Sequence, residues 1–251
     1  MVCGNNYFLL ILYILEGICK YNFFKRDFLC KFVLSMAAMA GKKVYIFDLG
    51  GVLLDLDVER SFGALAGLGM NPALLTEKDC LVNEMIQRFD KGDVEEDAFF
   101  GYIASCLPAG GLAGKALRER LADAWNMMLG GIAPEKLRVI SELRRRGDRV
   151  VMLSNTNIAH WPRIEEIFVE AAGKAPSEIF DALYLSFRMH ERKPCAEIFH
   201  ELLCDEDVAA GDCIFFDDSA ENCEAAQRLG IKSVLVKRNA SWNGLFDGIE
   251  Q

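Results

Sequence analysis

Short apolar runs alternate with amphipathic stretches over most of the chain beyond residue 42. The runs end at polar or turn residues and have the length of buried β-strands; they cover 44–47, 149–153, 182–185, 213–216 and 231–236. Helical periodicity separates them, over 134–146, from about 161, over 194–203 and over 219–229. Strands that alternate with helices of this length form a parallel sheet covered on both faces. The pattern therefore predicts an α/β fold with a doubly wound, Rossmann-like parallel sheet.

The stretch from Val58 to Leu129 has a different texture. It shows helical periodicity broken by small residues, and predicts roughly four helices with no strand between them. We therefore expect an all-helical cap over 57–131, inserted into a core made of 42–56 and 132–251. Because the insert follows the first strand, it should lie near the carboxyl end of that strand.

The first forty residues differ from the rest in being rich in Phe, Leu and Ile. The apolar run 7–18 is too short to span a bilayer, which needs ~20 residues, and no basic side chain precedes it as in a secretory signal. We expect 1–41 to be an extension outside the fold, with a peripheral anchor or a cleaved signal as the alternatives. Stable membrane insertion is not expected.

Composition and charge narrow the classes of function. Apolar residues make up 52% of the chain and charged residues 26%, which excludes wholesale disorder. Lys and Arg total 28 against 37 Asp and Glu, and this net charge of −9 argues against a nucleic-acid partner. The nine cysteines have irregular spacing and form no CxxC pair, so we expect reduced thiols, no zinc knuckle and a cytoplasmic location.

Polar side chains follow three of the expected strands. They are Asp48, Ser154 with Asn155, and Asp217 with Asp218, and Lys193 stands just before another helix. Each alone has a structural explanation as a turn, cap or solvated residue. Because ligands bind beyond the carboxyl ends of parallel strands, we expect the six side chains to converge there. Such a cluster of carboxylates is self-repelling without a cation, and its hard oxygen ligands suit Mg²⁺.

The chemistry of this set favours phosphoryl transfer. A carboxylate directed at a phosphoryl group is a competent nucleophile that forms an aspartyl-phosphate, which water then hydrolyses. A hydroxyl and an ammonium group can stabilise the charge on the transferred group's oxygens.

Four stretches of the chain resemble motifs I to IV of the haloacid dehalogenase-like (HAD) hydrolase superfamily. They are Phe47-Asp48-Leu49-Gly50-Gly51-Val52, Leu153-Ser154-Asn155, Arg192-Lys193-Pro194 and Phe215-Phe216-Asp217-Asp218-Ser219, in the family's order. The resemblance covers nearly all of 42–237. The position of the insert resembles a C1-type cap, and the motifs are most similar to the branch of bacterial α-D-glucose-1-phosphate phosphatases.

The resemblance implies a role for each motif residue. Asp48, Ser154 and Lys193 would be catalytic, and Ser154, Asn155 and Lys193 would bind the phosphate group. Asp48, the backbone carbonyl of Gly50 and Asp218 would hold Mg²⁺, with Asp217 as an outer-sphere or alternative ligand. Asn222 would brace the loop that carries the two aspartates.

Gly50 departs from the usual pattern of the family. Most phosphatases of the superfamily have a second Asp at this position, which protonates the leaving group and activates water. An anomeric leaving group needs less proton donation, because its hydroxyl is more acidic than an ordinary alcohol. The alternatives are a proton from the substrate, from water, from Asp55 or from a cap residue.

The resemblance implies a Mg²⁺-dependent phosphatase acting on a small phosphorylated substrate, such as a hexose 1-phosphate. A metal-independent haloacid dehalogenase is an alternative, although Asp217-Asp218 argues against it. A mutase is a less suitable alternative, because it would need the missing acid even more, to protonate and deprotonate sugar hydroxyls. A phospho-ligand-binding protein that lost catalysis through Gly50 is the alternative from another class.

Other polar and aromatic residues have structural interpretations. Asp55 and Asp57 are expected at the entry to the cap as hinge or capping residues. Phe89 and Trp125 are expected to pack within the cap. His190 is a candidate for the mouth of the site, whereas His160 and His200 are interpreted as surface or helix residues.

Overall fold

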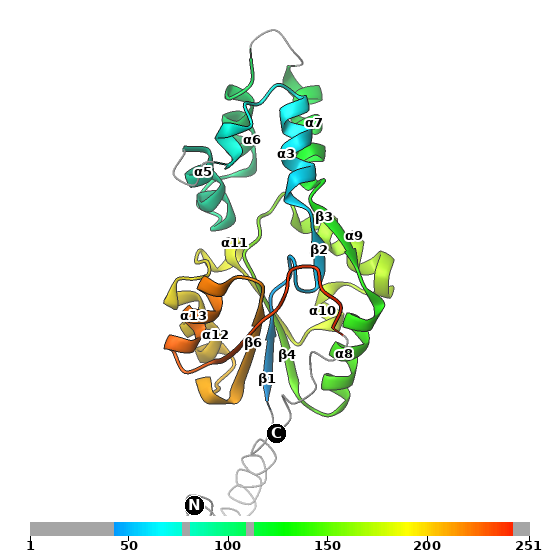
Figure 1. Ribbon diagram of the computed structural model, residues 1–251, viewed down its shortest axis with the longest axis vertical. Helices are drawn as coiled ribbons and strands as arrows, with labels where there is room; N and C mark the ends of the chain where they lie inside the picture. Colours follow the sequence, from blue (N-terminus) through cyan, green and yellow to red (C-terminus); the bar gives the residue numbers. More distant parts are fainter. Residues whose placement is uncertain (1–42, 77–80, 109–112, 243–251) are drawn as a thin grey trace, which may run out of the picture. The chain divides into compact units, whose positions relative to one another are not determined.

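The computed structural model of the protein describes residues 43–76, 81–108 and 113–242 (Figure 1). These residues belong to one compact unit, Lys43–Gln251. The expected extension 1–41, with its apolar run 7–18, lies outside the described residues. Over the ranges that are described, no helix is long and apolar enough to cross a membrane.

A parallel sheet of five strands runs through the structure in the order β5-β4-β1-β6-β7. The strands are β1 (Val44–Phe47), β4 (Arg149–Ser154), β5 (Ala182–Leu185), β6 (Cys213–Asp217) and β7 (Lys232–Leu235). All neighbouring strands in this sheet are parallel. The predicted parallel sheet is therefore confirmed, with each strand end within one residue of its expected position.

Alternate residues of the strands face opposite sides of the sheet, and both sides are buried. Tyr45 and Phe47 of β1 belong to one hydrophobic cluster, whereas Val44 and Ile46 belong to another. Burial on both faces explains why the strands appear in the sequence as continuous apolar runs rather than as alternating polar and apolar residues.

Helices cover the two faces of the sheet (Figure 1). The cluster of Val44 and Ile46 is completed by α12 (Ala196–Asp205) and α13 (Ala220–Arg228). The cluster of Tyr45 and Phe47 is completed by α8 (Pro134–Arg145) and α9 (Trp161–Ala172). Shorter helices are α10 (Pro176–Ile179), α11 (Ser186–Met189) and the 3₁₀-helix η1 (Ala210–Asp212). The doubly wound architecture agrees with the prediction.

The helical insert, here called the cap, has a hydrophobic core of its own. Its helices are α3 (Val58–Gly67), α4 (Ala73–Thr76), α5 (Leu81–Asp90), α6 (Glu96–Ser105) and α7 (Gly114–Asn126). Phe89 and Trp125 are 1% and 3% exposed within this core, as expected of packing residues. The four longer helices match the predicted number, and α4 is a short addition.

A two-stranded antiparallel sheet at the two ends of the cap was not predicted, although the described residues between α3 and α7 form no strand, as expected. It consists of β2 (Leu54–Leu56) and β3 (Leu129–Ile132), which flank the cap helices in the sequence. A Cβ atom at Gly130 would lie 2.8 Å from the backbone oxygen of Asp55, so only glycine allows the strands to approach this closely. The four-residue strand β3 contains two glycines, so it lacks the apolar pattern by which a strand is recognised in a sequence.

The two aspartates at the entry to the cap have structural partners. Asp57 is the N-cap residue of α3, and its Oδ1 accepts a hydrogen bond from Arg60 N (3.3 Å). Asp55 Oδ1 lies 3.4 Å from the Nζ atom of the buried Lys136, which is in the first turn of α8. The capping interpretation is confirmed for Asp57, and Asp55 forms an ion pair between β2 and the core.

Candidate active site

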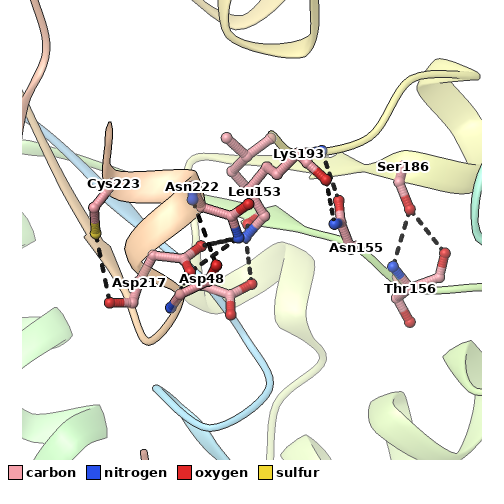
Figure 2. A network of polar contacts seen from close by, with 10 residues as sticks. Asp48, Leu153, Asn155, Thr156, Ser186, Lys193, Asp217, Asn222 and Cys223 are labelled. Carbon is pink, nitrogen blue, oxygen red and sulfur yellow. Dashed lines mark hydrogen bonds and ion pairs between the residues drawn. The ribbon is translucent and has the colours of Figure 1, made fainter. Parts of the chain in front are cut away.

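Lys193 is the centre of a buried polar network at the carboxyl ends of the strands (Figure 2). Its Nζ atom donates to Asp48 Oδ1 (2.6 Å), Asp217 Oδ2 (2.7 Å) and the backbone oxygen of Leu153 (2.8 Å). The Lys193 side chain is 1% exposed, so its charge is compensated by two carboxylates rather than by water. Three segments far apart in the sequence meet at this ammonium group.

The strand order explains why Asp48 and Asp217 meet. β1 and β6 are adjacent and parallel, with Phe47 opposite Phe216, so the residues that follow them leave the sheet side by side. Asp48 N donates to Phe216 O (2.9 Å), which continues the ladder by one residue. Asp217 ends β6, and its Oδ1 accepts from Ser219 N (2.8 Å) and from Asn222 Nδ2 (3.0 Å). Asn222 thus holds the aspartate loop from the first turn of α13.

Asp48, Asp217 and Asp218 form a cluster of potential metal ligands. One carboxylate oxygen of each lies within 4.8 Å of the others. Both oxygens of Asp217 are engaged by Lys193, Ser219 and Asn222, whereas Asp218 Oδ2 accepts from Arg238 Nε (2.5 Å). Asp48 and Asp218 are therefore better placed than Asp217 to coordinate a cation directly.

The burial of this network shifts the acidity of its members. Burial raises the pKa of Asp48 to about 7; the attraction of Lys193 opposes this shift, and the charge of Asp217 adds to it. Burial alone would lower the pKa of Lys193, but the charges of Asp217 and Asp48 raise it above the ordinary value. Lys193 is therefore charged. A divalent cation beside Asp48 would favour the ionised, nucleophilic form of the Asp48 carboxyl group.

Ser154 and Asn155 follow β4 and lie at the same edge of the sheet. Ser154 is 2% exposed, and both residues line a cavity that Gly50 also lines. The side chain of Asn155 is held by the backbone of Lys193: Nδ2 donates to Lys193 O (2.9 Å), and Oδ1 accepts from Lys193 N (2.9 Å). The structure thus brings the predicted residues together, but it commits the Asn155 amide to Lys193.

The cavity lies between the strand ends and the cap and has a volume of about 250 Å³. Polar residues, including Ser154, Asn155, Asn157, His160 and Asp90, line part of its wall. Apolar residues line the remainder: Leu49, Leu54, Leu56, Val58, Phe62, Leu75, Ile86, Trp125, Met128, Leu129 and Ile164. A cavity of this size accommodates a small substrate and not a folded protein.

The histidines were only partly anticipated. His160 is not a surface residue but is 6% exposed, lines the cavity and stacks on Trp125 with ring centroids 5.3 Å apart. Its burial follows from its position at the start of α9, which the apolar pattern alone could not reveal. His200 is exposed on α12, as expected. His190 is exposed beside Asp93 and is not among the residues that line the cavity.

Asp90 and Asn157 are cavity residues that the sequence analysis did not single out. Asn157 Nδ2 donates to Asp90 Oδ1 (2.9 Å), which joins the end of α5 in the cap to the loop after β4. Asn157 lies two residues after Leu153-Ser154-Asn155, the stretch that resembles motif II, and this proximity was a usable signal. Asp90 ends a helix before Lys91-Gly92-Asp93, a context that is typical of helix termini and gives no sign of a site.

The fold is a doubly wound α/β core with an inserted helical cap, and its polar site is a cluster of carboxylates around a buried lysine. The family model for haloacid dehalogenase-like hydrolases matches residues 42–230. The chain belongs to this family, as the resemblance of its motifs predicted.

Several known proteins are similar over most of the chain. D-ribitol-5-phosphate phosphatase from Bacteroides thetaiotaomicron is 29% identical over 203 residues, which cover 80% of this chain and 94% of the relative. A sesquiterpene phosphatase from Aspergillus oryzae is 27% identical, covering 75% and 87%. The crystal structure of a HAD family enzyme from Bacteroides thetaiotaomicron, in complex with magnesium and inorganic phosphate, is 30% identical with a TM-score of 0.72; the match covers 82% of this chain and 100% of that one.

Proposed function

We propose that the protein is a Mg²⁺-dependent phosphatase that hydrolyses a small phosphorylated metabolite through an aspartyl-phosphate on Asp48. The observation that carries the proposal is the contact of 2.6 Å between Lys193 Nζ and Asp48 Oδ1, beside two further carboxylates. A buried lysine in this position holds the nucleophile in place and offers positive charge to an incoming phosphate. The phosphatase and the magnesium complex among the relatives support the same reaction.

The donor set fits Mg²⁺. Asp48, Asp218 and the backbone carbonyl of Gly50 would hold the ion, and Asp217 would act through the outer sphere, since both its oxygens are engaged. Hard oxygen donors without thiolate or imidazole ligands are typical of this cation. When bound, the ion neutralises the charge of the phosphate and of the surrounding carboxylates.

Each side chain of the site then has a separate role in the reaction. Asp48 attacks phosphorus, and the ester bond to the leaving oxygen breaks as the aspartyl-phosphate forms. The hydroxyl of Ser154 and the ammonium group of Lys193 bind oxygens of the transferred group. Asn155 contributes through its two hydrogen bonds to Lys193, which fix the backbone from which the ammonium group extends. Asn222 holds Asp217 in the orientation that meets Lys193.

Sugar and sugar-alcohol phosphates are the first candidates for the substrate. A hexose 1-phosphate has an acidic anomeric leaving group, which suits a site with Gly50 in the position of the acid. A pentitol phosphate is supported by the similarity to D-ribitol-5-phosphate phosphatase. The cavity of about 250 Å³ is suited to metabolites of this size.

The phosphate ester of an apolar alcohol is a second candidate, favoured by the lining of the cavity. Most lining residues are apolar, and several of the polar side chains are already paired with one another. Asn155 is bound to Lys193, and Asn157 is bound to Asp90 and to His160 N. Few groups remain to pair with the hydroxyls of a polyol, and one relative acts on a sesquiterpene phosphate by its name.

Phosphate release from p-nitrophenyl phosphate, measured with and without Mg²⁺, tests the reaction. Wild type should turn over only with Mg²⁺, and Asp48→Asn should lose ~10⁴-fold or more in kcat. Asp123→Asn, at an exposed position on α7, serves as the matched control and should retain activity. Release of halide from a haloacid without metal, or phosphate binding without turnover, would instead favour the dehalogenase or the binding protein. A panel of hexose 1-phosphate, pentitol 5-phosphate and prenyl phosphate then separates the substrate classes.

A further inference from the structure

The reaction proposed above needs a proton donor that the first strand does not provide. Gly50 stands two residues after Asp48 and offers only its backbone. Two residues that line the cavity, Asp90 and His160, have titratable side chains. Both line the same cavity as Gly50 and Ser154, so each is a candidate for the source of the proton.

His160 is poorly suited to this task. Its burial lowers its pKa to about 3, so the ring is neutral at physiological pH. The Nδ1 atom is 2.8 Å from Asn126 Oδ1, and the ring stacks on Trp125. These contacts hold the imidazole as part of the wall rather than as an acid.

Asp90 is brought to the cavity by the docking of the cap on the core. Ser186 Oγ donates to the backbone oxygen of Asp90 (2.5 Å), and α5 packs against α11. Two residues further on, Gly92 has a φ of +71°, and a Cβ atom there would lie 2.3 Å from the backbone oxygen of Phe187. The end of α5 is therefore in close contact with α11, and this contact fixes where the Asp90 carboxyl enters the cavity.

Asn157 orients the Asp90 carboxyl group. His160 N donates to Asn157 Oδ1 (3.0 Å), which defines the orientation of the amide and leaves its Nδ2 group to face Asp90. This group donates to Asp90 Oδ1 (2.9 Å), so the proton of a neutral Asp90 must reside on Oδ2. In the described part of the chain, no hydrogen bond occupies Asp90 Oδ2, which leaves this oxygen available to a substrate.

We propose that Asp90, carried by the cap, is the general acid and base that replaces the missing carboxylate at Gly50. The inference rests on the proposed phosphatase function and adds to it the identity of the proton-transferring group. It also makes the docked cap a requirement for chemistry, since the acid is absent from the core.

The two steps balance around this carboxyl group. In the first, Asp48 attacks phosphorus, the bond from phosphorus to the ester oxygen breaks, and that oxygen takes the proton of Asp90 Oδ2 to leave as an alcohol. In the second, water attacks the aspartyl-phosphate and gives a proton to the Asp90 carboxylate. The bond from phosphorus to the Asp48 oxygen breaks, its electron pair returns to Asp48, and inorganic phosphate leaves. Asp90 ends the cycle protonated, as it began.

The environment of Asp90 supports this use. Burial raises the pKa of its carboxyl group, although the hydrogen bond from Asn157 and the charge of Arg192 act in the opposite direction. A carboxyl group with a raised pKa is more often protonated when the substrate binds, which a general acid requires.

A comparison of two esters of similar shape tests the proposal. p-Nitrophenyl phosphate has a good leaving group that needs no proton, whereas benzyl phosphate releases an ordinary alcohol. Asp90→Asn keeps the shape of the side chain and an oxygen for the Asn157 hydrogen bond, but has no proton to transfer. Its kcat on benzyl phosphate should fall by ~10²–10⁴-fold. Asp93→Asn, which changes a carboxylate outside the cavity, is the matched control and should retain the wild-type ratio of the two rates.

Rapid quenching with p-nitrophenyl phosphate adds a readout that a structural role would not give. In Asp90→Asn, the first step should remain fast and the second slow, so a burst of one p-nitrophenol per active site should precede slow turnover. An equal loss of kcat on both esters without a burst would overturn the role of Asp90, while leaving the phosphatase proposal intact. If Asp48→Asn were as active as wild type, or wild type were inactive on both esters, the proposed function itself would fail.

Discussion

The side-chain amide of Asn155 and the backbone of Lys193 form a closed pair of hydrogen bonds. Nδ2 donates to the Lys193 oxygen and Oδ1 accepts from the Lys193 nitrogen, both at 2.9 Å. The resemblance to the family implied that Asn155 binds phosphate. The side-chain contacts of Asn155 give it a further role, which is to join the end of β4 to the residue whose ammonium group contacts Asp48.

We predict that Asn155→Ala lowers kcat by roughly 10–100-fold, because a small displacement of Lys193 is costly in phosphoryl transfer. Loss of two hydrogen bonds should also lower the free energy of unfolding by ~1–3 kcal/mol. Steady-state kinetics and denaturant unfolding measure the two effects.

A double-mutant cycle with Lys193→Ala is the control for this role. If Asn155 acts by positioning Lys193, Asn155→Ala should cost much less activity when Lys193 is already absent. A full and additive loss in the double mutant would mean that Asn155 contacts the phosphate independently.

Mg²⁺ should stabilise the folded protein through the three clustered carboxylates. At a concentration of 100 times the dissociation constant, the gain is ~2.7 kcal/mol, or roughly 5–10 °C in Tm for a chain of this size. Asp218→Asn should abolish most of this shift, because Asp218 is a proposed direct ligand. An unchanged shift in this variant, measured by thermal unfolding with EDTA as the reference, would place the ion elsewhere.

The contact between the cap and the core at Gly92 should be intolerant of a side chain. Gly92→Ala forces a Cβ atom to within 2.3 Å of the Phe187 oxygen at a φ of +71°. We predict a loss of ~1–3 kcal/mol in stability and a fall in kcat on benzyl phosphate as Asp90 is displaced. Gly101→Ala in α6 is the matched control, since a Cβ atom at Gly101 would have no neighbouring atom within 4 Å outside the backbone of its own helix. It should be neutral or stabilise by up to ~1 kcal/mol; equal effects of the two changes would contradict the docking contact.

His160 should make the protein less stable in mild acid. Its pKa falls from the ordinary 6.5 to about 3 in the folded state because the ring is buried. Below pH 6.5 the unfolded chain binds a proton that the folded protein does not, so stability is lost as the pH falls from 6.5 towards 3. At pH 5 the loss is ~2 kcal/mol.

Denaturant unfolding at pH 7.5 and pH 5 measures how much stability wild type and the two histidine variants below lose in mild acid. His160→Gln should lose less stability than wild type between these two values. His200→Gln, at an exposed position on α12, should behave as wild type does. The same pH dependence in His160→Gln and wild type would show that the buried imidazole is not its cause.

The sequence predicted what depends on local pattern. Continuous apolar runs such as Val44–Phe47 marked the strands, because burial on both faces requires them. Asp48, Ser154 and Asp217 were predicted to converge because residues that follow parallel strands share one edge of the sheet. Their meeting at Lys193 depends on the order of the strands in the sheet, which the sequence analysis did not predict.

The sequence did not reveal contacts that depend on how the cap meets the core. Asp90 follows an ordinary amphipathic helix, and only the docking of α5 on α11 brings it to the cavity. Likewise, β2 and β3 are short, and their pairing joins residues more than seventy positions apart. Such pairings are set by tertiary packing rather than by local preference.

The most direct test of the account is detection of phosphate bound covalently to Asp48. Wild-type protein turning over p-nitrophenyl phosphate with Mg²⁺ is quenched in acid, digested with pepsin at low pH and analysed by mass spectrometry. We predict one phosphoryl group on the peptide that contains Asp48, with none on the corresponding peptide of Asp48→Asn. Phosphate release by wild type without this adduct, together with activity retained in Asp48→Asn, would contradict the proposed nucleophile.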